Sequence, residues 1–298
     1  MRDNRIDNFK GILIYLVVLG HLLEISGTGT LGNITYKAIY SFHMPAFMFL
    51  MGMVRKPNVK QIKKDLIIYL LFQLLYVSFD AMLFNKPLTI SYLVPYWILW
   101  FTLVEIYYGI VLILIKMVNV NIKWLFAVSI AISLVAGYIS RIGYSLSLSR
   151  AITFFPYFVG GMIFKEFKDK IHKYFFAGAA AVLCTLISIF VIKVNDSMLY
   201  GSFSYNASGA NPIIRLFIYV VAFTDILAIY MYLPNKEMPF VNGIGKSTLY
   251  IYLLHGFIIL LIKRFNFFVY NPIVNYLIAL SLSFVIVLLL SRVNKVWV

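Results

Sequence analysis

The chain is a succession of apolar segments, each near the length of a membrane-spanning helix, separated by short polar or turn-forming stretches. A helix needs about 20 mainly apolar residues to cross the roughly 30 Å hydrocarbon core of a bilayer. We therefore predict an all-α integral membrane protein, a bundle of about ten transmembrane helices with no soluble domain, in which residues 1–298 form a single membrane domain. The expected spans are 9–25, 34–54, 65–84, 92–115, 124–140, 151–164, 174–193, 212–233, 246–262 and 272–291, and the short sixth span is expected to begin within 146–150.

The composition agrees with a membrane protein. Hydrophobic residues make up 62% of the chain and charged residues 12%, which is more apolar surface than a soluble core needs. The net charge of +15 raises nucleic acid as a partner, but the basic residues lie between the apolar segments and not on a soluble face, so we predict no nucleic-acid binding. The single cysteine excludes an internal disulfide and a cysteine-based metal cluster, and no metal site is predicted.

The distribution of Lys and Arg predicts the orientation in the membrane. With the N-terminus inside, 18 of the 26 basic residues fall in inside segments. Cytoplasmic loops of membrane proteins carry an excess of Lys and Arg. We therefore expect a multi-pass protein of the cell (plasma) membrane with both termini in the cytoplasm.

The first apolar segment, residues 6–24, carries four ionisable side chains: Asp7, Lys10, His21 and Glu24. In a helix, Lys10 and His21 are three turns plus roughly 20° apart and lie about 16 Å apart along the axis. Asp7 precedes Lys10 by one turn and Glu24 follows His21 by one turn, so the four share one stripe. Ionisable groups inside a membrane usually mark a reaction or transport path. The alternative is a Lys10 that reaches the interface and a His21 that only packs.

Each of these residues suggests a chemical role. Lys10 is expected near the cytoplasmic surface, where it can bind a phosphate. His21 can take or carry a proton near neutral pH, and Glu24 can orient its ring. His43, in the stretch SFHMPAFMFLMG, is expected at a similar depth on the next helix, beside a kink at Pro45.

Three further regions supply candidates. The run RKPNVKQIKK at 55–64, with Arg55, Lys63 and Lys64, predicts a cytoplasmic anchor and a candidate site for a nucleotide or phosphate. Glu105 and His255 are candidate site-lining residues, for which helix packing or a structural hydrogen bond is the alternative.

Six stretches, taken in order, resemble a known family. They are RIDNFKGILIYLVVLGH (5–21), FHMPAFMFLMG (42–52), the basic run before LIIYLLFQLL, WILWFTLVEI (97–106), FFPYFVGGMIFKE (154–166) and IGKSTLYIYLLH (244–255). Together they resemble the acyltransferase type 3 family of integral membrane proteins, in particular its branch similar to fucose 4-O-acetylases. The resemblance covers nearly the whole chain.

The resemblance implies transfer of an acyl group, usually acetyl from acetyl-CoA, to a hydroxyl of a cell-surface glycan. The family's first helix has a basic residue, ten further residues and a histidine, which correspond here to Lys10 and His21. Many members have Arg at the first position, and Lys lacks the bidentate fork of Arg. The family's basic pair after the second helix corresponds to Lys63 and Lys64, or to Arg55.

The combined prediction is a membrane-bound O-acetyltransferase acting on a cell-envelope or capsular polysaccharide or its lipid-linked precursor. Acetyl-CoA is the donor substrate and no cofactor is permanently bound. His21 is a general base or a transient acyl carrier. The expected catalytic residues are His21, Glu24 and His43, the donor-binding residues Lys10, Arg55, Lys63 and Lys64, and the lining residues Asp7, Glu105 and His255.

A proton-coupled transporter or flippase for a glycan or a small anionic solute is the alternative function. Buried histidines and carboxylates suit proton coupling equally well. Such transporters often contain internal repeats, and we detect none in this sequence, which favours the enzyme.

Overall fold

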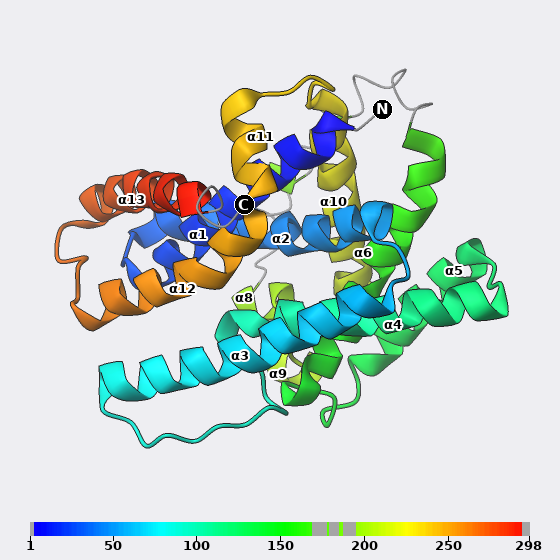
Figure 1. Ribbon diagram of the computed structural model, residues 1–298, viewed down its shortest axis with the longest axis horizontal. Helices are drawn as coiled ribbons and strands as arrows, with labels where there is room; N and C mark the ends of the chain where they lie inside the picture. The colour runs from blue at the N-terminus through cyan, green and yellow to red at the C-terminus, as the bar shows by residue number, and fades with distance from the viewer. Residues whose placement is uncertain (1–2, 169–177, 179–184, 187–194, 294–298) are drawn as a thin grey trace. The chain divides into compact units, whose positions relative to one another are not determined.

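The computed structural model describes residues 3–168, 178, 185, 186 and 195–293 (Figure 1). Within these residues the regular structure is helical and contains no strand, which confirms the all-α prediction. The longer helices are α1 (Asn4–Ile25), α2 (Gly29–Val54), α3 (Val59–Phe84), α4 (Trp100–Val118), α5 (Ile122–Ala136), α6 (Leu148–Phe167), α10 (Pro212–Tyr232), α12 (Thr248–Arg264) and α13 (Pro272–Val293). The shorter ones are η1 (Trp97–Leu99), η2 (Ser145–Ser147), α8 (Asp196–Leu199), α9 (Tyr205–Ser208) and α11 (Pro239–Lys246).

Six helical segments of the described chain are long and apolar enough to cross a membrane. They are Asn4–Ile25, Val59–Phe84, Trp97–Val118, Ser145–Phe167, Pro212–Tyr232 and Pro272–Val293. A seventh exists if α11 and α12, bent by 77° at the break between them, count as one span. α2 is not among the six, α5 is shorter, and the expected span 174–193 lies almost wholly outside the described residues. The count of about ten therefore stays a prediction.

Several expected boundaries differ from the observed ones. The sixth expected span does begin early, because α6 starts at Leu148. The expected helix over 92–115 was wrong at its start, since residues 92–96 are not helical and η1 begins at Trp97. Pro95 accounts for this difference, because proline disfavours helix at the residue before it and cannot donate a backbone hydrogen bond. The sequence prediction also missed α11.

The chain forms two compact units, each assembled from separate parts of the sequence. Unit 1 comprises Met1–Phe47, His172–Lys193 and Val221–Val298, and unit 2 comprises Met48–Ile171 and Val194–Val220.

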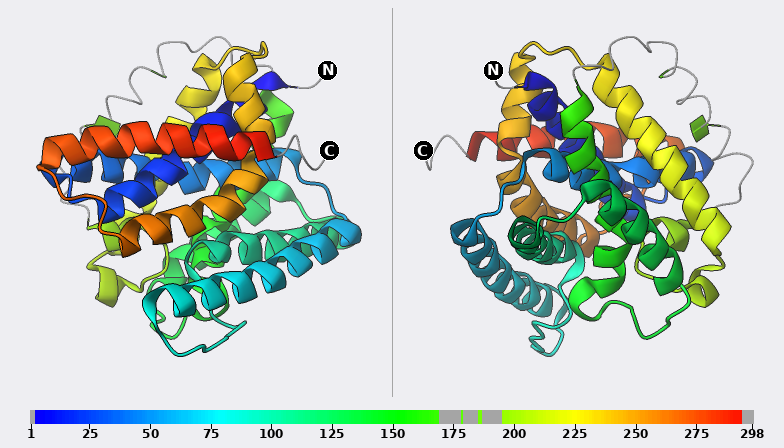
Figure 2. Two further views of the ribbon diagram at one scale, coloured as in Figure 1. Left: turned by 60° about the vertical axis from the view of Figure 1, so that its left-hand side comes forward. Right: turned by 90° about the vertical axis from the view of Figure 1, so that its right-hand side faces the viewer.

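In unit 1, α1 packs against α11, α12 and α13. Figure 2 (left) shows α13 in red, α1 in blue and α12 in orange running side by side. Two glycines permit the close approach of α1 and α11. A Cβ at Gly11 would lie 2.2 Å from the carbonyl oxygen of Val241, and a Cβ at Gly245 would lie 1.9 Å from that of Asp7. The backbones of these helices are therefore in direct contact, which fixes the position of α1 relative to α11.

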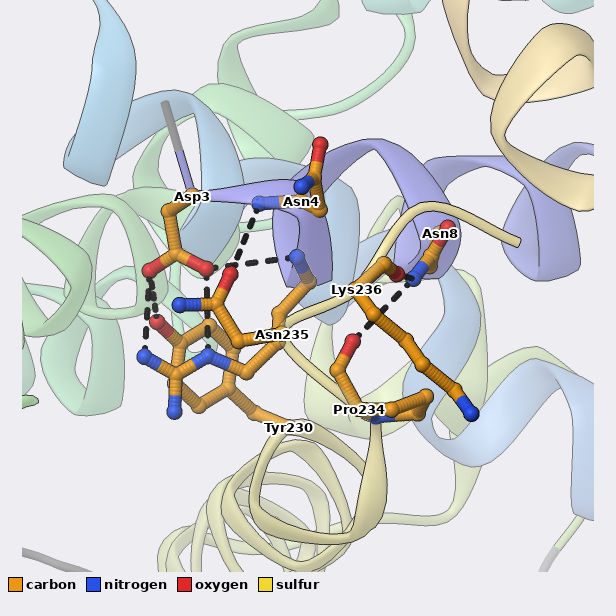
Figure 3. Close-up of polar contacts among 8 residues, drawn as sticks. Asp3, Asn4, Asn8, Tyr230, Pro234, Asn235 and Lys236 are labelled. Atoms are coloured by element: carbon orange, nitrogen blue, oxygen red, sulfur yellow. Dashed lines mark hydrogen bonds and ion pairs between the residues drawn. The ribbon is translucent and has the colours of Figure 1, made fainter. Parts of the chain in front are cut away.

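The start of α1 is also fixed by polar contacts (Figure 3). Asp3 caps the helix by accepting from the backbone N–H of Arg5 at 3.2 Å, and it also accepts from the Arg5 guanidinium at 3.0 Å. The hydroxyl of Tyr230 donates to Asp3 at 2.6 Å, and Asn8 donates to the backbone carbonyl of Pro234 at 3.2 Å. These contacts tie the N-terminus of α1 to the end of α10 and the segment after it.

In unit 2, α3 packs on α4, and α6 packs on both α4 and α5. Asn58 and Asn121 cap α3 and α5 by accepting backbone N–H groups of the first helical turn, which is a common role of Asn. Gly52 and Gly161 bring α2 and α6 together, because a Cβ at either would lie 1.9 Å from a backbone carbonyl oxygen of the other helix.

Candidate active site

The centre of the site is the pair His21 and Glu24 near the C-terminal end of α1. Nδ1 of His21 lies 3.2 Å from Oε2 of Glu24, and the two side chains keep 14% and 27% of their exposure. This is the contact that the helical spacing of the two residues predicts. An ionised carboxylate only accepts hydrogen bonds, so beside an ionised Glu24 a neutral imidazole carries its proton on Nδ1 and has its lone pair on Nε2. The pair therefore offers a basic nitrogen held in one orientation.

Two tyrosines from α2 hold the other oxygen of Glu24. Tyr40 donates to Oε1 at 2.7 Å and Tyr36 donates to the same atom at 2.9 Å. Their rings stack with centroids 4.0 Å apart, and the Tyr40 hydroxyl also lies 3.4 Å from Nδ1 of His21. Hydrogen bonds to a charged acceptor are stronger than neutral ones, so the three donors fix the carboxylate in place. Sequence reasoning missed both tyrosines, although their spacing of four residues puts them on one helix face.

His255 from α12 stacks on His21. The two ring centroids are 5.6 Å apart and the planes differ by 22°. His255 is completely buried, and its Nδ1 donates to the backbone carbonyl of Ile251 at 2.9 Å. Its Nε2 has no hydrogen-bond partner within the described part of the chain. His255, which was predicted to line the site, thus lies beside the ring of His21. With its proton on Nδ1, the imidazole of His255 has its lone pair on Nε2.

His43 from α2 joins the same group through Tyr40. Its ring centroid lies 4.7 Å from that of Tyr40, and its Nδ1 donates to the backbone carbonyl of Ile39 at 2.7 Å. The structure therefore gathers five side chains, His21, Glu24, Tyr40, His43 and His255, which we call the imidazole cluster. All five belong to unit 1. Pro45, which was expected to mark this region, lies inside α2.

Asp7 and Lys10 do not belong to the imidazole cluster. They precede His21 on the same helix by about 21 Å and about 16 Å along the axis. Asp7 is buried where α1 meets α11, and Lys10 is half-buried. The predicted stripe of ionisable groups thus separates into a polar entry region and the cluster near the other end of α1.

Arg55 and Glu105 meet in unit 2, together with a residue that the sequence analysis did not select. The guanidinium of Arg55 lies 2.5 Å from Oδ2 of Asp65 and 3.7 Å from Oε1 of Glu105. Gln61 donates to the other oxygen of Asp65 at 2.7 Å. Asp65 is buried, and its position directly after the basic run was the signal that could have identified it. Arg55 is thus an ion-pair partner of two carboxylates, and its contact with a donor molecule stays a prediction.

The other two basic candidates, Lys63 and Lys64, are exposed on α3. Among the residues that the structure describes, no group of three or more His, Cys, Asp or Glu is placed to hold a metal ion. The side chains of the imidazole cluster can carry out acid–base chemistry: the imidazole of His21 can accept a proton, and Glu24 can stabilise the imidazolium that results.

Apolar helices of spanning length indicate a multi-pass membrane protein, and the histidine held by a carboxylate on the first of them is a candidate acid–base group. Comparison with known families gives its class: the model of the family described as "Acyltransferase domain" matches residues 3–292, so the chain belongs to this family. The resemblance noted in the sequence is thereby confirmed.

Curated relatives match a short segment. The chain is 51% identical over 55 residues to the nodulation protein NolL of Sinorhizobium fredii and 49% identical over 55 residues to that of Mesorhizobium japonicum. Each match covers 17% of this chain and 15% of the relative. The comparison with solved structures gave no match.

Proposed function

We propose that the protein is a membrane-bound O-acyltransferase that moves an acetyl group from acetyl-CoA to a hydroxyl of a cell-envelope or capsular polysaccharide, or of its lipid-linked precursor. Membership of the acyltransferase family supports the reaction class. The observation that carries the proposal is the 3.2 Å contact between Nδ1 of His21 and Glu24, because it pairs an imidazole with a carboxylate that can orient the ring.

The proposed reaction is a direct transfer. Nε2 of His21 takes the proton of the acceptor hydroxyl as the hydroxyl oxygen attacks the thioester carbonyl carbon. The C–O bond forms, the C–S bond breaks, and the coenzyme A thiolate leaves and takes the proton from the imidazolium. Glu24, held by Tyr36 and Tyr40, keeps the correct tautomer and stabilises the positive ring, as the aspartate does in a Ser–His–Asp triad.

The remaining members of the cluster have supporting roles in this proposal. Tyr40 contacts Glu24 and the ring of His43, so it links the carboxylate to the second predicted catalytic histidine. His255 stacks on His21 and limits the rotation of its ring. A fixed ring favours proton transfer along one direction, which is the main benefit of a preorganised base.

The donor is proposed to approach from the cytoplasmic side, where the excess of Lys and Arg also places both termini. Lys10 would contact a phosphate of acetyl-CoA in unit 1, as a point charge without bidentate geometry. Arg55, Lys63 and Lys64 are the donor-binding candidates of unit 2. The same proposal places the protein in the plasma membrane.

The proposal is tested by mass spectrometry of the cell-surface glycans. Three strains are compared: a strain lacking the gene, the same strain carrying the wild-type gene, and the same strain carrying His21→Ala. We expect acetyl groups to be absent from the first and third strains and present in the second, at equal protein levels in the membrane. Equal acetylation in all three would reject the function, and uptake of a solute driven by a proton gradient without any acetylated product would favour a transporter.

A further inference from the structure

A cavity of about 460 Å³ lies in unit 2, and no residue of the imidazole cluster lines it. One wall is the segment 140–144, which follows α5, and the other is the segment 202–207, which includes the start of α9. Figure 1 labels both helices. Its volume falls within the range of about 300–1,000 Å³ that is usual for small-molecule sites. It is therefore large enough for a small organic ligand.

The cavity is lined by neutral groups of two kinds. Hydroxyls come from Ser140, Ser202 and Ser204, and an amide comes from Asn206. Aromatic rings come from Tyr144 and Phe203, whose centroids are 5.6 Å apart in an edge-to-face arrangement. None of the lining residues carries a charge. Two cations lie close by, Arg141 within the first wall segment and Arg150, whose guanidinium lies 5.2 Å from the ring centroid of Tyr144; neither is a lining residue.

The side chain of Ser202 is one of the lining hydroxyls. Its Oγ is buried and has no hydrogen-bond partner among the residues that the structure describes. Buried polar groups in proteins are nearly always hydrogen-bonded, so this hydroxyl is a candidate partner for a hydroxyl of a ligand in the cavity.

The walls are held in place by contacts within unit 2. Ser149 donates from Oγ to the carbonyl of Gly201 at 2.8 Å. The backbone N–H of Tyr205 donates to the carbonyl of Gly137 at 2.8 Å, and its hydroxyl donates to that of Leu134 at 2.8 Å. Gly201 has a φ of +64°, a conformation that favours glycine. The second wall is thus anchored to α5 and α6, and a preformed site loses less entropy on binding.

From these observations we propose that this cavity binds an uncharged sugar residue. A sugar ring presents hydroxyls around its edge and C–H groups on its faces. The hydroxyls match the serines and Asn206, and the C–H face matches the negative face of an aromatic ring. Both walls belong to segments that the orientation from Lys and Arg places outside the cell, where a surface glycan is built. The identification of this sugar as part of the acetyl acceptor rests on the proposed function. The proposal that the cavity binds a sugar does not depend on that function.

Gly143 provides a direct test, because it lines the cavity and a Cβ added there meets no atom within 4 Å. Gly143→Trp adds a bulky ring at the cavity lining without a clash at its Cβ, and Gly143→Ala is the matched control that adds only a methyl group. The purified full chain in nanodiscs is examined by saturation-transfer difference NMR. The probes are the methyl glycosides of glucose, galactose and mannose, with glucuronate as the charged comparison.

We expect at least one neutral glycoside to give a signal with the wild type and with Gly143→Ala, and the signal to fall by about tenfold with Gly143→Trp, as for a residue that blocks the centre of a site. Ser202→Ala should weaken the same signal. The hydroxyl of Tyr205 donates to Leu134 in α5, so Tyr205→Phe should not change which glycoside the protein prefers. The absence of any signal from the three glycosides, an unchanged signal with Gly143→Trp, or a preference for glucuronate would overturn the proposal.

The NMR measurement needs neither acetyl-CoA nor turnover, so it separates this proposal from the proposed function. If sugar binds and no acetyl transfer occurs with the wild type, the cavity remains a sugar site and the acyltransferase proposal fails. If transfer occurs and Gly143→Trp transfers at the wild-type rate, the cavity has no part in acceptor binding.

Discussion

Glu24→Gln is the substitution that tests the geometry of the imidazole cluster most sharply, because it keeps the shape of the side chain and changes what it can donate and accept. Tyr36 and Tyr40 both donate to Oε1 of Glu24, so the amide oxygen of the glutamine should occupy that place. The amide NH₂ then faces Nδ1 of His21. Since NH₂ only donates, the imidazole must present a lone pair at Nδ1 and carry its proton on Nε2.

The consequence is the loss of the base at the reacting position. General base catalysis contributes about 10²–10⁴-fold to a rate, which corresponds to about 2.7–5.4 kcal/mol in the activation free energy. We expect kcat to fall within this range, with the KM for acetyl-CoA little changed, because the glutamine disturbs only proton transfer. Protein stability should be nearly unchanged, since the two tyrosine hydroxyls keep an acceptor.

The assay is the initial rate of transfer of a radiolabelled acetyl group in membranes, normalised to the amount of protein. Glu24→Asp is the matched control, because it keeps the charge and the acceptors and should retain part of the activity. A Glu24→Gln enzyme with a kcat within about twofold of the wild type would refute the role of the pair, since it would show that the tautomer of His21 does not matter.

Three further substitutions test other parts of the account. Tyr40→Phe removes a hydrogen bond to a charged acceptor, worth about 1.5–3 kcal/mol, so kcat should fall by about 10–150-fold. Tyr276→Phe, which loses its contact with Thr35, should leave the rate unchanged, and equal rates for the two variants would remove Tyr40 from the site. Lys10→Ala should raise the KM for acetyl-CoA about tenfold at nearly constant kcat, and Lys10→Arg should keep the KM near the wild-type value. An unchanged KM in Lys10→Ala would exclude a contact between Lys10 and the donor. Gly245→Ala should lower the free energy of unfolding by about 1–3 kcal/mol and therefore lower the thermal midpoint in detergent. Gly243→Ala should not, because a Cβ at Gly243 meets no atom within 4 Å. Equal midpoints for the two variants would contradict the close packing of α1 on α11.

Helical periodicity was sufficient to predict the contact between His21 and Glu24, because residues three apart on one helix always lie close together. The partners from other helices could not be predicted in this way. Tyr36 and Tyr40 on α2 and His255 on α12 reach the pair only through tertiary packing. A period identifies the face of a helix that is buried and leaves open which helix covers that face.

Arg55 illustrates the same limit for charged residues. The basic run around it predicts a cytoplasmic segment, and each Lys or Arg of this run is a candidate ligand for an anion. In the structure its guanidinium lies between Asp65 and Glu105, whose place beside it depends on the packing of α3 and α4. Hydropathy also overextended the helix that follows Pro95, because it measures composition and not backbone geometry.

The proposed reaction depends on proton abstraction from the acceptor hydroxyl by Nε2 of His21. The most direct measurement is acetyl transfer by the purified protein in nanodiscs, from radiolabelled acetyl-CoA to the isolated glycan, for the wild type and for His21→Ala. We predict transfer by the wild type and a loss of about 10²-fold or more with His21→Ala, at an unchanged thermal midpoint. Transfer by His21→Ala at the rate of the wild type would contradict this role of His21.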